Sequence, residues 1–343
     1  MWFGASLRRS VEPAFTTVAE TLRLADSGDS RATPHGFAEV VAAAKAVAEA
    51  LRANVLRVLK DESYGVLELC RIVDTAQPAL SHHLKVLHRA GLLARRREGN
   101  SIFYRRAPAP TAFHAALLAA IDEVPLPAAQ AQRIEAVHAE RSRRSEAFFA
   151  EHATDFATNQ ARICESSVYA GSVLDLVERL GLGGGTALEI GPGDGELLLR
   201  LAGRFHEVVG IDSAQGMLER CAGRVAGSRN VRLVHRDFTD MPARPRFQLV
   251  LAAMVAHHQP SPQRFFRHAG KLLRRDGVLV VVELCRHDHE WARAACGDLW
   301  LGFEPAELTE WAVNAGLHPG ESQFLAQKNG FRIQIHAYQQ PSR

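Results

Sequence analysis

The chain has 343 residues, which is too long for one ordinary domain and about right for two. Its five cysteines form no CxxC pair and are odd in number, which argues against a disulfide framework and is typical of a reducing cytoplasm. No apolar run approaches the ~18 residues that a membrane helix needs, and no apolar segment follows the paired arginines near the start. We therefore expect a cytoplasmic protein with no secretory signal and no membrane partner.

Charge is distributed unevenly along the chain. The window from Ala50 to Ala107 holds eleven Lys or Arg residues and five Asp or Glu residues and thus carries +6, whereas the whole chain carries +3. A basic block beside a mildly acidic remainder indicates one domain for nucleic acid and another for a different ligand. Residues 1–36 have little pattern, and we assign them to an N-terminal extension without a stated function.

Helical periodicity dominates the first folded region. Apolar residues recur at helical spacing between Phe37 and Leu59, and a short helix is expected over Val66–Val73. A third helix is expected within TAQPALSHHLKVLHRAGLL, because Pro78 suits an early helical position and Gly91 suits the position after the last turn. One face of this helix is apolar, with Leu80, Leu84 and Leu87. The other faces carry side chains of the kinds that bind base edges in a major groove, namely Gln77, Ser81, His82, His83 and Lys85.

A basic hairpin is predicted directly after this helix. In LLARRREGNSIFYRRA, alternating residues flank Glu98-Gly99-Asn100, which is a hairpin turn signal. Arginines crowd both strands: Arg95, Arg96, Arg97, Arg105 and Arg106. A basic β-hairpin beside a reading helix is the wing of a winged helix, and its arginines can contact phosphates or enter the minor groove.

The stretch QPALSHHLKVLHRAGLLARRREGNSIFYRRA resembles the reading helix and wing of ArsR-type repressors. The similarity covers about residues 40–107, within a domain that we place at 37–107. The resemblance implies an α+β winged helix-turn-helix, a double-stranded DNA operator as partner and a homodimer on a two-fold site. It also implies DNA contacts by the polar residues of the reading helix and by Arg95–Arg97. A small winged helix that serves only protein contacts is the alternative.

One cysteine departs from the metal-sensing members of that family, which often carry the paired cysteines of ELCVC. Here the stretch is Glu68-Leu69-Cys70-Arg71-Ile72, so Ile72 stands where the second thiolate would be required. A lone thiolate is a poor soft-metal site, because such sites usually need about two to four sulfur or nitrogen ligands. We predict that Cys70 is a small core residue and that a signal other than a metal switches the protein.

A helical linker is expected over residues 108–160. One helix is predicted over Thr111–Ile121 and a longer one over Ala128–Ala150, whose face is strongly charged. The longer helix is either a solvated spacer or a spacer that also contributes to a dimer interface, and we favour the second interpretation.

A glycine loop opens the second folded region. The stretch TALEIGPGDGELLLRLA reads as strand, loop and helix, with Glu189 before the loop and glycines at alternate positions, Gly191, Gly193 and Gly195. The backbone at glycines can approach a ligand closely, and a helix N-terminus favours negative charge. The GxGxG pattern is a weak signal by itself, because dinucleotide enzymes use GxGxxG at the same place.

Acids near the ends of the next two strands add to this signal. The strand HEVVGIDSA contains Asp212, 19 residues after Gly193, where a carboxylate can accept both ribose hydroxyls. The strand VRLVHRDFTDMP delivers Asp237 and Phe238, which suit an adenine because the carboxylate can accept the exocyclic amine and the ring can pack on the base. Two further strands are expected in FQLVLAAMVAHH and DGVLVVVELCRH.

These motifs and their spacing resemble class I S-adenosylmethionine-dependent methyltransferases over about residues 165–343, within a domain that we place at 161–343. The resemblance implies an α/β Rossmann-like fold with S-adenosylmethionine or S-adenosylhomocysteine as cofactor. The implied cofactor-binding residues are Glu189, Gly191 and Gly193 at the methionine part, Asp212 at the ribose, and Asp237 and Phe238 at the adenine, together with Gly195, Ser213 and Met254. A positively charged sulfonium also accounts for the acid at Glu189, which a phosphate site would avoid. The alternative is that these acids only cap helices.

Histidines follow two of the predicted strands. His257 and His258 come after the fourth strand, where such methyltransferases place substrate-side residues, and they are weak candidates for a catalytic base. A structural role is the alternative. The stretch His287-Asp288-His289 follows the fifth strand, but alternate spacing on a loop is a weak signal for a metal, and we predict no metal site.

The two resemblances together predict a multidomain protein, in which an α+β winged helix-turn-helix is followed by an α/β Rossmann-like methyltransferase domain. We expect a transcriptional regulator, with repression as its action, whose second domain binds S-adenosylmethionine or S-adenosylhomocysteine as effector. The alternative is an active S-adenosylmethionine-dependent methyltransferase of a small molecule, tethered to a DNA-binding domain. The sequence leaves both open, because a sensor needs only the cofactor pocket, whereas an enzyme also needs an acceptor pocket.

Overall fold

A computed structural model describes residues 36–99, 101–244 and 246–341 of the chain. Of the extension expected at residues 1–36, only residue 36 is described. Asn100 of the predicted wing turn also lies outside the described residues. Both folded regions belong to one compact unit, Pro34–Arg343. Within the described part, no helix combines the length and the apolar character needed to span a bilayer.

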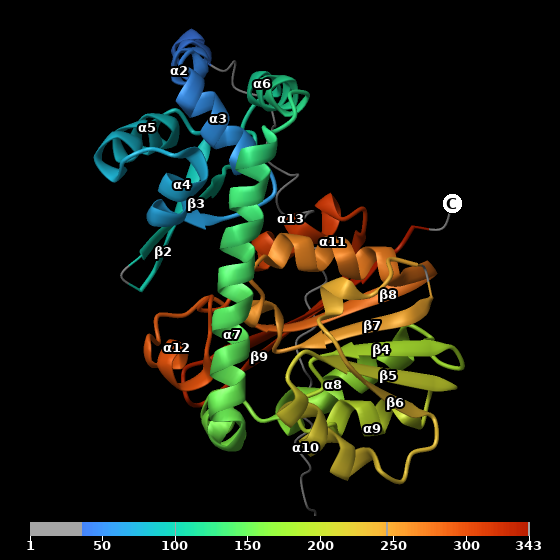
Figure 1. The fold of residues 1–343 in the computed structure, drawn as a ribbon. Coiled ribbons are helices and arrows are strands. Elements are labelled where there is room, and N and C mark those ends of the chain that lie inside the picture. The colour runs from blue at the N-terminus through green and yellow to red at the C-terminus, as the bar shows by residue number, and fades with distance from the viewer. Residues whose placement is uncertain (1–35, 100, 245, 342–343) are drawn as a thin grey trace, which may run out of the picture. The chain divides into compact units, whose positions relative to one another are not determined.

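The first elements form a winged helix-turn-helix (Figure 1). Its helices are α2 (Phe37–Val47), α3 (Ala50–Val58), α4 (Val66–Val73) and α5 (Gln77–Arg89). An antiparallel sheet of order β1-β3-β2 completes it, with β1 (Tyr64–Gly65), β2 (Leu93–Glu98) and β3 (Ser101–Arg106). The predicted apolar stripe of α5 is fully buried: Leu80, Leu84 and Leu87. The structure thus confirms both the reading helix and the hairpin.

Two helices follow the wing, α6 (Ala112–Asp122) and α7 (Ala128–Ile163). The second helix is longer than the predicted Ala128–Ala150, because no Gly or Pro interrupts the sequence before the extended backbone at Cys164. Its first third contributes Ile134 and Val137 to the hydrophobic core of the winged helix. That core therefore continues beyond the boundary predicted at residue 107.

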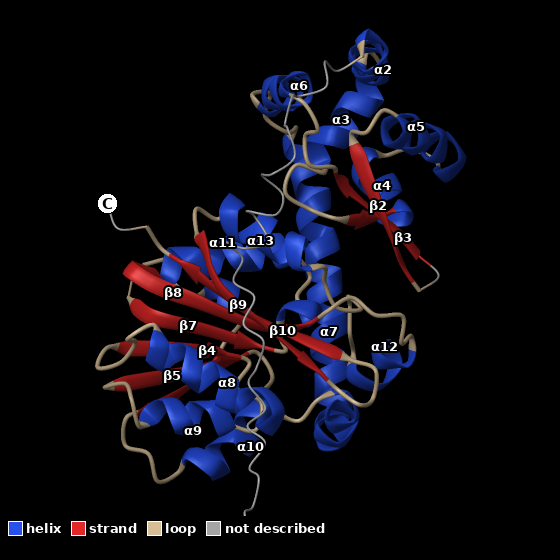
Figure 2. Ribbon diagram, turned by 180° about the vertical axis from the view of Figure 1, so that it is seen from behind, coloured by secondary structure: helices blue, strands red, loops and turns tan. Residues whose placement is uncertain are grey.

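The remaining elements form a doubly wound α/β domain around one sheet (Figures 1 and 2). Its strands are β4 (Thr186–Ile190), β5 (Glu207–Asp212), β6 (Val231–His235), β7 (Phe247–Ala253), β8 (Leu273–Leu284), β9 (His318–Ala326) and β10 (Arg332–Gln339). The strand order is β6-β5-β4-β7-β8-β10-β9, in which the first five strands are parallel and β10 is antiparallel to β8 and β9. The order reverses at β4, and the carboxyl ends of strands at such a switch point form a crevice for ligands.

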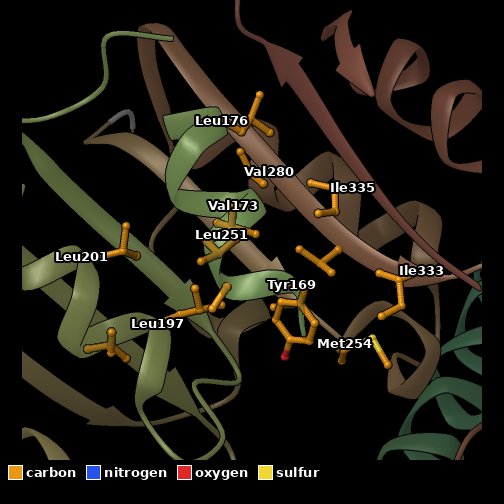
Figure 3. Packing of buried hydrophobic residues seen from close by; sticks show 14 of the residues in the cluster. Tyr169, Val173, Leu176, Leu197, Leu201, Leu251, Met254, Val280, Ile333 and Ile335 are labelled. Atoms are coloured by element: carbon orange, nitrogen blue, oxygen red, sulfur yellow. The ribbon is translucent and has the colours of Figure 1, made fainter. Parts of the chain in front are cut away.

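Helices cover both faces of this sheet. On one face lie α8 (Ser166–Arg179), α9 (Glu196–Ala202), α10 (Gln215–Val225) and α12 (Trp291–Cys296). On the other face lie α11 (Pro262–Leu272) and α13 (Pro305–Asn314). Figure 3 shows α8 side chains packed on the first face: Tyr169, Val173 and Leu176. The strand residues beneath them include Leu251, Val280 and Ile335.

The central strand β7 shows why this region folds as a buried parallel sheet. Leu249 and Leu251 face the α8 side, whereas Val250 and Ala252 face the α11 side, and every residue of the strand is buried. A continuous apolar run is typical of a strand covered on both faces. The last two strands lie outside the five strands predicted from the sequence. Most of β9 is exposed, and its sequence HPGESQFLA shows no regular alternation of apolar and polar residues, so it lacks the signal on which those predictions rest.

Candidate functional site

A cavity of about 420 Å³ opens at the carboxyl ends of the strands around the switch point. All of the predicted cofactor residues except Gly195 line it: Glu189, Gly191, Gly193, Asp212, Ser213, Asp237, Phe238 and Met254. These residues are far apart in sequence, but parallel strands present their carboxyl ends at one edge of a sheet. The structure therefore brings together one candidate ligand site.

The glycine loop runs along the wall of this cavity in a conformation that requires glycine. Gly191 has a φ of 63°, and a Cβ added there would lie 2.6 Å from Cγ2 of Val255. Gly195 has a φ of 83°, but its added Cβ would meet Sγ of Cys221 on α10 at 2.8 Å. Gly195 therefore allows α9 and α10 to approach each other, and it is not among the residues that line the cavity.

Glu189 is a buried carboxylate at the end of β4. It is 2% exposed, and its Oε2 has no hydrogen-bond partner among the described residues. Burial, with a smaller contribution from Asp194, raises the pKa of this carboxyl well above its usual range. A buried carboxylate oxygen in a cavity wall is costly without a partner and is suited to a cationic group.

The two acids predicted for the nucleoside are held by local hydrogen bonds. Asp212 accepts from the backbone N of Ala214 through Oδ1 at 2.8 Å, and burial raises the pKa of its carboxyl to about 6. Asp237 accepts from the backbone N and the hydroxyl of Thr239, both through Oδ1, at 2.8 and 2.7 Å. Asp237 thus caps the 3-10 turn η1 (Phe238–Asp240), as the helix-capping interpretation predicts, and it also lines the cavity.

Two apolar side chains complete the part of the cavity that was predicted from the sequence. The ring of Phe238 is buried and packs on Phe265 and His268, with centroid distances of 5.0 and 4.8 Å. Met254 follows β7 with a φ of 58°, a value that residues other than glycine rarely adopt. Its backbone N donates to the carbonyl of Val282 at 2.8 Å, and such strained positions are typical of ligand sites.

The helices before the sheet also line the cavity, and the sequence analysis missed them. From α7 come Ser145, Phe149, Gln160 and Ala161, and from α8 comes Tyr169. The charged face of α7 gives no ligand signal in the sequence, so these residues are identified only by the fold. The cavity is therefore built by both the sheet and the connecting helix.

The two predicted histidines occupy different positions in the 3-10 turn η2 (Ala256–His258). His258 lines the cavity, and its ring packs edge-on against Phe149 at a centroid distance of 5.0 Å. His257 is turned away and its Nδ1 lies 2.8 Å from Oε2 of Glu283. Burial opposes the charged form of His257, but Glu283 and Asp298 together raise its pKa to about 9. Only His258 can therefore contact a molecule in the cavity.

The predicted DNA-binding residues of α5 lie mostly on its open side. Gln77, His82 and Lys85 are exposed, and Ser81 is partly exposed. His83 is tied back toward α3, with Nδ1 3.5 Å from Oε2 of Glu49. The geometry leaves four of these five side chains on a surface that can enter a groove.

The wing divides its arginines between two faces, because successive residues of a strand point to opposite sides. Arg95 and Arg97 are exposed. Arg96 is buried, pairs with Glu98 and Glu307, and lies over the ring of Phe303 at 5.5 Å. The expectation that all three arginines face DNA therefore needs correction at Arg96, whose guanidinium binds the second domain.

The buried face of the wing docks on the loop after α12. Glu98 is 3% exposed, accepts from the side chain of Arg293, and accepts from the backbone N of Leu301 at 3.2 Å. Arg96 also donates to the carbonyl of Gly302. The same loop carries Asp298, near the cavity, so one segment contacts both the wing and the wall behind the ligand site.

Arg141 joins the two domains at the middle of α7. It donates to both carboxylate oxygens of Glu68 in the winged helix and to the carbonyl of Pro260 in the second domain, the latter at 2.6 Å. Its guanidinium lies within 5.6 Å of three ring centroids, those of Tyr64, Phe103 and Trp300. The winged helix and the α/β domain therefore share a polar junction as well as a helix.

These features define the class of the protein: a winged helix-turn-helix DNA-binding domain followed by a methyltransferase-fold domain. Residues 50–95 match the family described as bacterial regulatory protein, arsR family, and residues 188–281 match the methyltransferase domain family. The chain belongs to the arsR family of bacterial regulatory proteins and carries a methyltransferase domain after the DNA-binding domain.

Known proteins resemble one domain or the other. An HTH-type transcriptional regulator of Methanocaldococcus jannaschii is 36% identical over 63 residues, which are 18% of this chain and 68% of that protein. A ubiquinone biosynthesis O-methyltransferase of Azorhizobium caulinodans is 34% identical over 128 residues, which are 36% of this chain and 50% of that protein. The chain thus spans half the length of that methyltransferase.

One solved structure is similar to part of the chain. Burkholderia thailandensis 1,6-didemethyltoxoflavin-N1-methyltransferase, with bound 1,6-didemethyltoxoflavin and S-adenosylhomocysteine, is 21% identical with a TM-score of 0.48. The match covers 64% of this chain and 93% of that one.

Proposed function

We propose that the protein is a DNA-binding transcriptional repressor whose methyltransferase-fold domain binds S-adenosylmethionine or S-adenosylhomocysteine as effector. The observation that carries the proposal is the double role of α7, which completes the core of the winged helix and also lines the ligand cavity. An occupant of the cavity therefore contacts the helix on which the DNA-binding domain is built. We expect a cytoplasmic homodimer on a two-fold operator.

The residues of the cavity fit this ligand. The unpaired carboxylate oxygen of Glu189 suits the cationic methionine end, Asp212 suits the ribose hydroxyls, and Phe238 with Asp237 suits the adenine. S-adenosylmethionine, when bound, supplies a methyl group on a sulfonium. The amino acid part of either ligand keeps its ammonium, so Glu189 has a partner in both cases.

A ligand changes DNA affinity only if it binds the DNA-bound and DNA-free conformations with different affinity. The wing offers a route for this difference, because Arg96 and Glu98 hold the loop after α12, whose Asp298 lies beside His258 in the cavity wall. A ligand that shifts α7 or this loop would move the wing relative to α5. The exposed arginines of the wing and the polar face of α5 could then no longer bind the same DNA site at the same time, and DNA affinity would fall.

An active methyltransferase tethered to DNA is the second candidate function. It is favoured by His258, Gln259 and Phe149, which line the cavity beyond the predicted cofactor residues, where a methyl acceptor would have to bind. His258 would there be the candidate catalytic base.

Operator binding, titrated with each ligand, tests the proposal. Duplexes selected from a random pool by the full chain serve as operator, and affinity is measured with S-adenosylmethionine, S-adenosylhomocysteine or neither. We expect one ligand to change DNA affinity by about fivefold or more, which is the usual range for linked sites. Ligand binding without any change in DNA affinity contradicts the sensor function. Steady release of S-adenosylhomocysteine from S-adenosylmethionine supports the enzyme instead.

A further inference from the structure

A buried polar cluster lies behind the ligand cavity, and the effector function proposed above does not use it. It consists of His257 and His258 in η2, Glu283 near the end of β8, and Asp298 in the loop after α12. The cluster forms because β7 and β8 are parallel neighbours, so the residues at and after their carboxyl ends come together. All four side chains are buried.

Asp298 is unusual in this cluster because it is buried without a hydrogen-bond partner among the described residues. Its side chain is 3% exposed, and neither carboxylate oxygen has a hydrogen-bond partner in the described part of the chain. The nearest basic groups are Nε2 of His257 and Nδ1 of His258, which lie 3.8 and 3.9 Å from Oδ1. Both distances exceed hydrogen-bond length. A charged imidazolium at His257 satisfies Glu283 and still leaves Asp298 without a hydrogen bond, which is costly in a buried site.

The spacing of these atoms suits a shared metal ion. One ring nitrogen of His257, one ring nitrogen of His258 and one carboxylate oxygen of Asp298 all lie within 4.8 Å of one another. Two ligands about 2.0–2.2 Å from one ion are separated by at most about 4.4 Å, so small side-chain movements bring all three to bonding distance. Glu283 accepts from Nδ1 of His257 at 2.8 Å and thereby points Nε2 at Asp298, which is how a carboxylate usually orients a metal-bound histidine.

We propose that His257 Nε2, His258 Nδ1 and Asp298 Oδ1 bind a divalent transition-metal ion, with Glu283 as the positioning residue. Two imidazole nitrogens and one carboxylate favour ions such as Zn²⁺, Fe²⁺ or Co²⁺ over Mg²⁺ and Ca²⁺, which prefer oxygen ligands. The ion also offsets the two buried negative charges of Glu283 and Asp298. His258 binds it as the tautomer protonated on Nε2 and gives up its 3.4 Å contact with the carbonyl of Gly297.

The site borders the ligand cavity, because His258 belongs to both. Three protein ligands leave at least one coordination position open, as catalytic zinc sites do. That position would accept an oxygen, nitrogen or sulfur atom of a molecule bound in the cavity. The site is independent of the proposed effector function and does not involve Cys70. It replaces the expectation of no metal, which considered His287, Asp288 and His289 and not these residues.

Zn²⁺ and Co²⁺ titrations of the full chain, first stripped with a chelator, test the site. We expect one ion per chain, and a Co²⁺ absorption spectrum without thiolate charge transfer. D298N should weaken Zn²⁺ binding at least tenfold, and E283Q should weaken it by about 10–100-fold. C70S and D288N, the matched controls, should bind as the wild type does. Absence of stoichiometric binding to the wild type overturns the proposal, and so does undiminished binding to D298N.

Thermal unfolding separates the metal site from a purely structural ion pair. With the chelator present, D298N removes an unpaired charge and should unfold at or above the wild-type temperature, whereas only the wild type should gain stability from Zn²⁺. A D298N variant that unfolds below the wild type in chelator, with no Zn²⁺ stabilisation of the wild type, shows that Asp298 pairs with imidazolium and overturns the proposal. H258Q, at the rim of the cavity, provides the same Zn²⁺ comparison if D298N does not fold.

Discussion

At the scale of single residues, the ligand cavity depends on a few carboxylates whose roles differ. Asp212 is held at the cavity rim by the backbone of Ala214, so its second oxygen can be positioned before a ligand arrives. Glu189, in contrast, has an unpaired oxygen and needs a cation. Asp212 is thus positioned to accept hydrogen bonds from hydroxyl groups, and Glu189 is suited to bind a cationic group.

Replacing Asp212 with Ala should weaken binding of S-adenosylmethionine and S-adenosylhomocysteine at least tenfold. Hydrogen bonds to a charged acceptor are worth about 1.5–3 kcal/mol each, and about 1.4 kcal/mol corresponds to a factor of ten. Calorimetry on the full chain measures the loss. The exposed Asp240, which does not line the cavity, provides the control D240A, and equal affinity for D212A and D240A would remove Asp212 from the ribose site.

Ligand affinity should also depend on pH through this residue. Burial raises the folded-state pKa of Asp212 to about 6, so the unliganded protein takes up a proton on Asp212 as the pH falls through 6. The neutral acid accepts hydroxyl hydrogen bonds less well, and affinity should therefore fall between pH 7 and pH 5. The same uptake stabilises the unliganded fold as the pH falls toward the ordinary value near 4, because the folded state binds more protons than the unfolded state. Calorimetry from pH 5 to 8 should show a smaller slope for D212N, and an identical slope would assign the dependence elsewhere.

Cys70 should not act as a metal switch. It packs against the core of the winged helix, and burial raises the pKa of its thiol, which disfavours the thiolate that metals bind. C70S should release operator DNA in arsenite or zinc at the same concentration as the wild type. A metal response of the wild type that disappears in C70S contradicts this assignment.

At the scale of elements, the two faces of the wing have different surroundings: one is exposed, and the other packs against the second domain. Arg95 and Arg97 are exposed, whereas Arg96 is buried against the second domain. Replacing Arg95 and Arg97 with Ala should reduce the slope of log affinity against log salt by about 0.9 for each lost phosphate contact. R96A should leave that slope unchanged, although it removes a buried ion pair. Salt titrations of operator binding measure both, and an unchanged slope for the double variant excludes the wing from the phosphate surface.

The sequence predicts elements well where apolar periodicity and turn residues agree. The reading helix is an example, because its three leucines, the early proline and the glycine after it all indicate the same boundaries. The glycine loop and the acids after the strands likewise predict the part of the cavity wall that the strand ends form, because parallel strands fix where such residues meet. The sequence also predicts the hairpin of the wing, but not that Arg96 lies on a face packed against the second domain, because that is a tertiary contact.

Other parts of the site have no local signal. The cavity residues of α7 belong to a charged helix, and the metal cluster joins His257 to Asp298 across 41 positions of sequence. Neither pattern resembles a motif, because the ligands of such a site are adjacent only after the sheet has formed. The edge strand β9 is missed for a simpler reason, since its sequence HPGESQFLA shows no regular alternation of apolar and polar residues.

At the scale of the whole molecule, the effector response should depend on the contact between the wing and the second domain. E98Q weakens the hold on Arg293 and Leu301 without touching the cavity or the exposed face of the wing. We expect ligand affinity and basal DNA affinity to stay within about twofold of the wild type. The change of DNA affinity on ligand addition should be smaller, because the two sites are coupled only if the contact between them responds to both ligands. E290Q, which alters a more exposed partner of Arg293, is the matched control. A full ligand response in E98Q would show that coupling runs through α7 alone.

The shared helix also affects how the protein is made. A winged helix predicted to end near residue 107 would finish folding early in synthesis, but its core includes Ile134 and Val137. The emerging chain must therefore release the first turns of α7 before the DNA-binding domain closes, and domains fold as units during translation. At about 1.5 Å per residue, α7 is roughly 54 Å long, and its partners in the second domain, α10 and α12, are synthesised after it. A nascent chain arrested before α7 should thus expose apolar surface and be cleaved readily by protease, whereas one arrested after residue 163 should protect the winged helix.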